Sequence, residues 1–314
     1  MTQVAVVGAG RWGRNLVRTF HELGVLAEVV ELSPELRAQV QKDFPAVRVS
    51  ADLSAVLKGP ISAIAIATPV ATHFEVARMA LEAGKDVFVE KPMTLHESEA
   101  EELVGLARSK GRVLMVGHLL LYQPAITFIR DFIAQGKLGA VHSLHQERLN
   151  LGTARKVENA LWSLGVHDVA VLLDLVGSAP ESVMVTGQSV LTPKVEDDVY
   201  LHMGFRGGVH AHLHCSWLWP EKRRGLTVVG SKGMLCFDEA TQAVTFHDKG
   251  ISPDFKNRDA GAKEVFKGDG QPLTLELKHF LECCTTRAEP ISGGAGAAAV
   301  VRVLEQATKL LEDA

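Results

Sequence analysis

The sequence has few cysteines, and their spacing is not that of a metal site. Its four thiols are Cys215, Cys236, Cys283 and Cys284, and no pair of them has CxxC spacing. Disulfide frameworks occur in small, cysteine-dense secreted chains, and cysteine zinc sites use CxxC pairs. We therefore expect reduced, buried thiols and a cytoplasmic protein.

The sequence also lacks an excess of positive charge and a long apolar segment. Its net charge is −4 and its pI is ≈ 6.4, which argues against nucleic acid or an anionic membrane as the main partner. No apolar run reaches the ~20 residues of a membrane-spanning helix. Met1-Thr2-Gln3 leads at once into a strand pattern, so we expect no signal peptide and no membrane partner.

What the sequence does contain is typical of a globular protein. Its 314 residues are 46% hydrophobic and 22% charged, enough for two domains with sizeable cores. We predict two domains, an α/β domain over residues 1–120 and an α+β domain over residues 121–314.

The chain opens with a strand, a glycine-rich turn and a helix. Val4-Ala5-Val6-Val7 is an apolar run typical of a parallel strand covered on both faces. It leads into Gly8-Ala9-Gly10-Arg11-Trp12-Gly13, a G-x-G-x-x-G pattern, and then into a helical pattern over residues 15–23. Such glycines let the backbone approach a pyrophosphate, and a helix N-terminus offers free N–H groups to phosphates. This context predicts a dinucleotide site.

An acidic residue ends the second predicted strand, residues 26–30. Glu31 lies about 20 positions beyond the glycines, where a carboxylate accepts hydrogen bonds from the ribose hydroxyls and repels a 2′-phosphate. This position favours NAD over NADP, although Arg37 is close in sequence and an exposed acid at a strand end is the alternative interpretation.

Strands and helices continue to alternate up to residue 116. A strand that ends at Val89 leads into Glu90-Lys91-Pro92, and proline stops the ladder because it has no N–H to donate. Lys91 is thereby placed at the carboxyl end of a strand, where open α/β sheets bind ligands. The alternation predicts a doubly wound parallel sheet, so we expect residues 1–120 to form a dinucleotide-binding Rossmann domain. The further predicted elements are strands at 62–67, 87–89 and 113–116 and helices ending at 57 and spanning 72–83 and 96–109.

These motifs and their order resemble the Gfo/Idh/MocA family of oxidoreductases. The resemblance is carried by the glycine turn, Ala67-Thr68-Pro69 with His73, Glu90-Lys91-Pro92 and Gly117-His118, and it extends over almost the whole chain. In that family the lysine lies beside the nicotinamide and the reacting hydroxyl, and the Thr-Pro loop lines the cofactor. The resemblance therefore implies a catalytic and substrate-contacting Lys91. It also implies cofactor contacts from Gly8, Gly10, Arg11, Trp12, Gly13, Glu31, Thr68, Pro69, His73, Glu90, Lys91 and Trp162.

The second half is rich in strands separated by turns such as Arg206-Gly207-Gly208. Successive strands with hairpin turns predict a largely antiparallel sheet. One helical layer on an open sheet matches the second domain of the family, and in the family the free face of that sheet commonly pairs subunits. We therefore expect residues 121–314 to form a substrate-binding and oligomerisation α+β domain, and the chain to form a homo-oligomer (dimer or tetramer). The predicted strands are 141–148, 183–190, 198–205, 209–217, 226–229, 234–238 and 243–246, with helices at 122–135, 162–176, 275–284 and 296–311.

The helix that begins at Trp162 carries His167, which matches the family's catalytic histidine. The resemblance implies that His167 removes the hydroxyl proton and contacts the substrate. The inositol dehydrogenase branch has an aspartate one turn before this histidine, whereas this chain has Ser163, which cannot act as an anionic partner.

Several local segments resemble bacterial UDP-N-acetylglucosaminuronate 3-dehydrogenases, a branch that also tends to carry serine at position 163. In that branch Arg155, Asn159 and Ser163 fall at substrate-contacting positions. The chain has Gln123, Thr153 and Val157 where a histidine, a basic residue and a glutamate are expected. These segments are 119–124, 149–152, 158–163 and 216–220.

His210, His212 and His214 alternate along one strand and share a face. Three imidazoles can bind a metal, but no acidic partner is near them in sequence and the family chemistry uses no metal. We predict no metal site and expect a polar sheet face or a subunit contact.

We predict NAD-dependent oxidation of a secondary sugar hydroxyl, namely the 3-hydroxyl of a UDP-N-acetylglucosaminuronate-type sugar nucleotide. His167 would accept the proton and Lys91 would stabilise the developing alkoxide. Two alternatives remain open. One is a dehydrogenase of a free polyol or monosaccharide, and the other is a non-catalytic sugar- or nucleotide-sensing regulator, which Ser163 favours and the retained lysine and histidine oppose.

Overall fold

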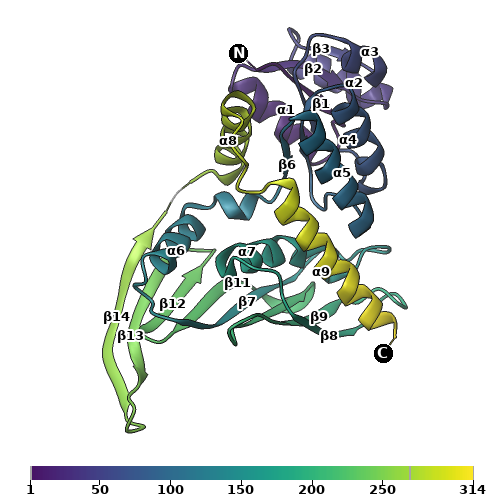
Figure 1. Ribbon diagram of the computed structural model, residues 1–314. Helices are drawn as coiled ribbons and strands as arrows, with labels where there is room; N and C mark the ends of the chain where they lie inside the picture. Colours follow the sequence, from purple (N-terminus) through teal and green to yellow (C-terminus); the bar gives the residue numbers. More distant parts are fainter. Residues whose placement is uncertain (1, 269, 314) are drawn as a thin grey trace. The chain divides into compact units, whose positions relative to one another are not determined.

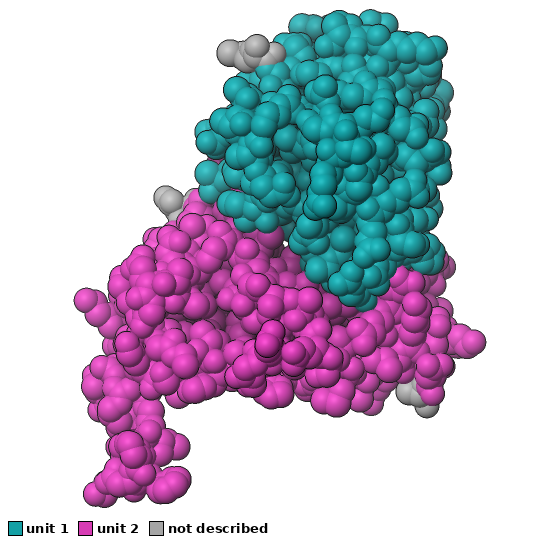
Figure 2. All heavy atoms as spheres, viewed as in Figure 1, with its two compact units in different colours: residues 1–119, 273–302 teal, residues 120–272, 303–314 magenta. Residues whose placement is uncertain are grey.

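The structure is a computed structural model that describes residues 2–268 and 270–313. Residues 1, 269 and 314, which fall within the predicted domains, lie outside the described residues. The chain forms two compact units, coloured separately in Figure 2. Unit 1 comprises Met1–Leu119 and Leu273–Arg302, and unit 2 comprises Leu120–Pro272 and Val303–Ala314.

Unit 1 contains a six-stranded parallel sheet in the order β3-β2-β1-β4-β5-β6. The central strands β1, β4 and β5 are buried along their whole length; β1 and β4 are wholly apolar, and β5 is apolar after Asp86. The predicted doubly wound parallel sheet is thus confirmed. The strand order reverses beside β1, and ligands of such sheets bind at the carboxyl ends of the strands there. The strands are β1 Val4–Val7, β2 Leu26–Val30, β3 Arg48–Ser50, β4 Ala63–Ile66, β5 Asp86–Val89 and β6 Leu114–Val116.

The helices of unit 1 connect these strands. The sequence prediction missed α2 and β3, although Ser33-Pro34 is a recognisable helix start: the Ser33 hydroxyl accepts from the N–H of Leu36 at 3.3 Å, and proline occupies the first turn. The helices are α1 Gly13–Glu22, α2 Pro34–Asp43, α3 Leu53–Lys58, the 3₁₀ turn η1 Val70–Thr72, α4 His73–Glu82 and α5 Glu97–Lys110.

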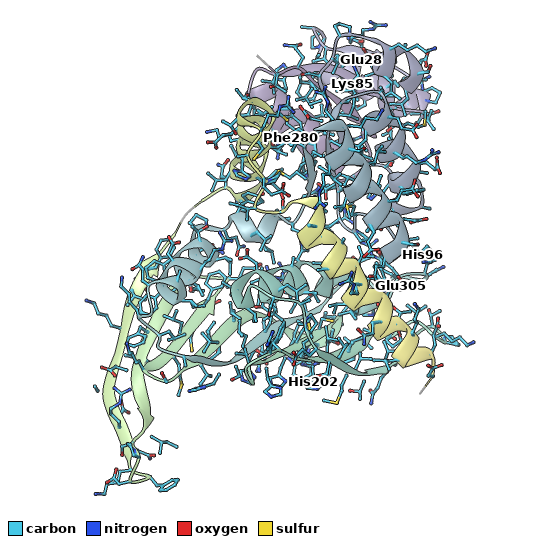
Figure 3. The ribbon with its side chains drawn as sticks, in the orientation of Figure 1. Glu28, Lys85, His96, His202, Phe280 and Glu305 are labelled. Carbon is cyan, nitrogen blue, oxygen red and sulfur yellow. The ribbon has the colours of Figure 1, made fainter. Side chains whose placement is uncertain are left out.

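The C-terminal segment 273–302 packs with unit 1, whereas the sequence prediction placed it in the second domain. Phe280 of α8 (Pro272–Thr286), labelled in Figure 3, meets Phe88 of β5 edge to face at 5.7 Å between ring centroids. Arg287 forms an ion pair with the buried Asp86 at 2.6 Å. These contacts join residues about 200 positions apart, which local sequence patterns do not encode. α9 (Gly294–Glu312) follows.

Unit 2 is built on an eight-stranded sheet in the order β14-β13-β12-β11-β7-β10-β9-β8. Every neighbouring pair is antiparallel except β10 and β7, which are parallel, so the predicted largely antiparallel sheet is confirmed. The strands are β7 Val141–Leu151, β8 Ser182–Gln188, β9 Asp198–Gly204, β10 His210–Ser216, β11 Leu218–Gly230, β12 Gly233–Asp238, β13 Ala243–Ile251 and β14 Asn257–Lys267.

The edge strand β14 is absent from the sequence prediction. It is exposed along most of its length and pairs with β13 as a long two-stranded ribbon (Figure 1). Its mixture of charged and small residues lacks the apolar alternation from which strands are predicted. Backbone pairing with β13 determines this strand.

Two helices cover one face of this sheet (Figure 1). α6 (Pro124–Ala134) packs Phe128 on Phe266 of β14 and Phe132 on Phe246 of β13, with ring centroids 5.0 and 5.6 Å apart. α7 (Val166–Val176) is almost entirely buried and follows a π-helical turn, η3 (Leu161–Gly165). The 3₁₀ turn η2 (Leu119–Tyr122) precedes α6. No helix in the described part of the chain combines the length and apolarity needed to span a bilayer.

Candidate active site

The glycine turn after β1 has a different requirement at each glycine. Gly8 has φ +94°, and a Cβ there would lie 2.8 Å from the carbonyl oxygen of Ala67, at the end of β4. A Cβ on Gly13 would lie 2.2 Å from the carbonyl oxygen of Gly8. A Cβ on Gly10 would meet no atom within 4 Å. Gly8 and Gly13 thus allow tight packing, while Gly10 leaves open space at the N-terminal end of α1 where a pyrophosphate fits.

Glu31 is held at the glycine turn by its carboxylate. Oε2 accepts from the N–H of Ala9 at 2.7 Å, and Oε1 accepts from the N–H of Ser33 at 2.9 Å. Arg37, the possible ligand of a 2′-phosphate, donates from Nη1 to the carbonyls of Glu31 at 2.8 Å and Leu32 at 2.7 Å. A carboxylate beside the turn and an arginine engaged with backbone fit the diol of NAD.

His73 links the two loops that follow β4 and β5. It is 2% exposed, with Nδ1 2.9 Å from the carbonyl oxygen of Pro92 and Nε2 2.9 Å from that of Thr68. Burial lowers the pKa of His73, while the two carbonyls oppose that shift. A neutral imidazole has one N–H and donates to one carbonyl at a time. Both ring nitrogens of His73 therefore face backbone carbonyls, one in the loop of Thr68 and Pro69 and one at Pro92.

Glu90 connects the lysine motif to the glycine turn. Its carboxylate is buried and accepts a hydrogen bond from the indole N–H of Trp12. The N–H of Lys91 donates to Glu90 Oε2 at 3.3 Å, and the missing side chain of Gly117 makes room for this carboxyl. Burial raises the pKa of Glu90 to about 7, against the opposing effects of Trp12 and Lys91. Lys91, only partly exposed, thus follows a carboxyl that titrates near neutral pH.

Two buried titratable groups near Glu90 have no role in the sequence prediction. Burial and the charge of Lys91 lower the pKa of His118 to about 3, so its imidazole is neutral at pH 7. Glu276, on α8, is 1% exposed, and burial together with Glu90 raises the pKa of its carboxyl well above the ordinary value. Glu276 occupies the buried stripe of α8 with Phe280 and Cys284, at i, i+4 and i+8. This helical spacing is the sequence signal that could have predicted that Glu276 is buried.

In unit 2, His167 lies in the first turn of α7 and is half-buried. Trp162 and Ser163 lie in the π-helical turn just before it, a feature frequent at functional sites. The indole N–H of Trp162 donates to the Thr308 hydroxyl at 2.8 Å, and the backbone N–H of Trp162 donates to Asn159 Oδ1 at 3.1 Å.

The predicted substrate residues Arg155 and Asn159 differ in their surroundings. Asn159 is 7% exposed, and besides accepting from Trp162 it donates to Glu196 Oε2 at 2.8 Å, so it shapes the turn that leads to His167. The Arg155 side chain is 46% exposed and forms an ion pair with Glu158 at 3.3 Å. Arg155 is therefore the more accessible of the two side chains and the one that carries a positive charge. Arg11 is exposed on the glycine turn of unit 1.

The histidines of β10 lie on the sheet face opposite α7, where His202 is labelled in Figure 3. His202 Nδ1 lies 2.7 Å from His212 Nδ1, and the ring of His145 stacks on His212 with centroids 4.8 Å apart. Burial and the neighbouring histidines lower the pKa of His212. Within residues 2–268 and 270–313, no three His, Cys, Asp or Glu side chains are arranged to bind a metal. The cluster is a polar surface of the sheet.

Two family models match the chain. Residues 2–118 match the model described as "Oxidoreductase family, NAD-binding Rossmann fold", and residues 126–236 match the "GFO/IDH/MocA C-terminal domain".

Individual relatives match over nearly the full length. UDP-N-acetylglucosamine 3-dehydrogenase of Acidithiobacillus ferrooxidans is 29% identical over 287 residues, which are 89% of this chain and 87% of that protein. A solved structure of that enzyme superposes with a TM-score of 0.88 at 26% identity and covers 99% of this chain and 98% of its own. A structure from Magnetospirillum magnetotacticum described as an oxidoreductase has a TM-score of 0.83 at 31% identity and covers 96% of this chain and 98% of its own.

Proposed function

Because the chain belongs to the Gfo/Idh/MocA family of NAD-binding oxidoreductases, we propose that it oxidises the 3-hydroxyl of a UDP-linked N-acetylated amino sugar. NAD supplies the hydride acceptor when bound. The observation that carries the proposal is the attachment of Glu90-Lys91 to the dinucleotide turn through the hydrogen bond from Trp12.

Lys91 and His167 have complementary roles in this proposal. The ammonium of Lys91 is a compact charge that stabilises a developing alkoxide more strongly in a water-poor site than in water. His167 accepts the hydroxyl proton, and general base catalysis of this kind contributes about 10²–10⁴-fold. Ser163 is uncharged, so it orients ligands by hydrogen bonding without changing the charge beside His167.

The substrate class rests on the similarity to UDP-N-acetylglucosamine 3-dehydrogenase. The sugar named there has no carboxylate, unlike the uronate that the sequence alone indicated. Thr153 stands where the uronate branch is expected to have a basic residue, and a neutral sugar needs no such cation. The accessible guanidinium of Arg155 suits the diphosphate, which accepts bidentate hydrogen bonds from arginine.

The test follows the absorbance of reduced nicotinamide with a panel of hydroxyl donors: UDP-N-acetylglucosamine, its uronate, free N-acetylglucosamine and a polyol. We expect turnover with UDP-N-acetylglucosamine, and a loss of about 10²–10⁴-fold in Lys91→Ala and His167→Ala with NAD affinity maintained. Turnover of the free sugar or polyol alone would contradict the substrate class. Binding of UDP-sugars without any NADH would instead support a sensing regulator.

We also propose that copies of the chain associate through the sheet face opposite α6 and α7. That face carries stacked histidines rather than a helical layer. Light scattering coupled to size-exclusion chromatography should give a multiple of 33.9 kDa. Introducing a charge with His212→Glu should reduce the mass to that of one chain. A monomer in the unsubstituted protein would contradict this assembly.

A further inference from the structure

α7 is attached to the sheet of unit 2 by a buried ionic contact. Asp168 has no exposed surface, and its two oxygens receive Arg148 of β7 in a bidentate pair, at 2.5 Å from Nε and 2.8 Å from Nη2. Gln146 of the same strand donates to Asp168 Oδ1 at 2.9 Å. Asp168 is therefore fixed to two successive inward-facing positions of β7.

The contact extends into a group of four charges. Arg148 Nη2 also donates to Glu239 Oε2 at 3.0 Å, and Arg224 of β11 donates from Nη1 to Glu239 Oε1 at 3.0 Å. Arg224 lies opposite Arg148 in the β7–β11 ladder. We call Asp168, Arg148, Glu239 and Arg224 the charge quartet. Its two cations balance its two anions.

Asp168 and Arg148 form the buried end of the charge quartet, with side chains 0% and 5% exposed, while those of Glu239 and Arg224 are 14% and 29% exposed. The other buried residues of α7 are Val166, Val169, Ala170, Val171, Leu172, Leu173 and Leu175. Burial raises the pKa of Asp168, although the charge of Arg148 acts in the opposite direction. Burial alone would lower the pKa of Arg148, but the charges of Asp168 and Glu239 outweigh it and raise that pKa. The nearby Cys215 thiol is neutral, because burial raises its pKa well above the ordinary value. Apolar residues in place of such a buried pair are often equally or more stable, so stability alone is a weak reason for it.

Position gives a stronger reason. Asp168 directly follows His167, and successive residues of an α-helix point about 100° apart around its axis. Apolar packing alone lets a helix rotate or slide with modest loss, whereas a bidentate pair fixes direction and distance. Fixing Asp168 on β7 therefore fixes the direction in which His167 leaves α7.

We propose that Asp168 and Arg148 are positioning residues that hold the His167 imidazole in its reactive orientation. The proposal rests on the proposed function, in which His167 is the general base. Because the quartet is balanced in charge, a variant that removes one cation and one anion changes its geometry without changing its net charge.

The test compares Asp168→Asn, Arg148→Lys and the double variant Asp168→Asn/Arg148→Met. Asp174→Asn is the matched control, because Asp174 lies six residues further along α7 and pairs with Arg130 at 2.8 Å. Circular dichroism and thermal melting establish folding. We expect kcat to fall about 10- to 100-fold in Asp168→Asn, as for a small misplacement of a reacting group, with the KM for NAD unchanged. Arg148→Lys keeps the positive charge beside Asp168, so kcat should fall less in this variant than in Asp168→Asn.

The pH profile separates geometry from charge. Asp168→Asn leaves one surplus positive charge near His167, so the acidic limb of kcat/KM should move to lower pH by about one unit. The double variant also removes the positive charge of Arg148. It should therefore return the acidic limb of kcat/KM to its original pH without restoring kcat. A double variant that regains kcat as well, or an Asp174→Asn control that loses as much as Asp168→Asn, would overturn the positioning role. If His167→Ala is fully active, the proposed function fails first and independently.

Discussion

The indole N–H of Trp12 donates a hydrogen bond to the buried carboxylate of Glu90. This bond connects the turn after β1 with the residue that precedes Lys91, across 78 positions of sequence. It links the dinucleotide turn to the lysine motif within one unit. Because both partners of this hydrogen bond belong to the chain itself, the effect of Glu90 on the pH dependence of stability should be measurable without cofactor.

Glu90 should make the cofactor-free protein less stable as pH rises toward neutrality. The pKa of Glu90 is about 7 in the folded chain and ordinarily 4.5, so the folded state binds the proton more tightly than the unfolded state. The stability that this proton contributes is lost as pH rises from 4.5 to 7. This decline in the free energy of unfolding should be about 3 kcal/mol, and it should be absent in Glu90→Gln. Urea unfolding at pH 4.5, 6 and 7.5 checks it, and parallel curves for the two proteins would contradict it.

Glu276 should be replaceable by Gln without loss at neutral pH. Burial and Glu90 raise the pKa of its carboxyl and so favour the protonated form, and an amide has nearly the same shape as that form. At higher pH the native carboxyl must ionise in an apolar site, so Glu276→Gln should be the more stable protein in alkaline buffer. Melting temperatures at pH 7 and 9.5 test this, and a lower value for the variant at pH 9.5 would refute it.

The glycine turn offers a matched pair of substitutions. Gly13→Ala should destabilise the protein by several kcal/mol, because its Cβ would lie 2.2 Å from the Gly8 carbonyl oxygen. Gly10→Ala meets no atom within 4 Å, so it should fold normally and weaken NAD binding by at least about tenfold, since the methyl occupies the pyrophosphate space. Thermal melting and calorimetric NAD titration distinguish the two. Equal NAD affinity in Gly10→Ala would rule out this placement of the pyrophosphate.

His73 should matter for both stability and cofactor affinity. His73→Phe keeps a buried ring but removes the hydrogen bond that the neutral imidazole donates to the carbonyl of Thr68 or Pro92, at a cost of about 1–3 kcal/mol. Loosening both loops should also weaken NAD binding. Thr72→Val is the control, since it removes only the hydroxyl contacts with Thr68 and Pro69 on one loop. Calorimetry should show the larger loss for His73→Phe, and a similar loss in both variants would count against a two-loop bridge.

The sequence by itself determined the parallel sheet, the glycine turn with Glu31, and the position of Lys91 after β5. Each depends on local rules: apolar runs form buried strands, glycines permit tight turns, and proline ends a ladder. The antiparallel sheet of unit 2 also followed from its short strands and turns, apart from β14.

Tertiary structure alone decided which distant groups meet. Glu276 joins Glu90 because α8 returns to unit 1, and Asp168 pairs with Arg148 because α7 packs on β7. His73 has the family's position in sequence, but only folding shows that both its nitrogens face backbone carbonyls. Burial determines the charges of these groups, and burial depends on the path of the whole chain.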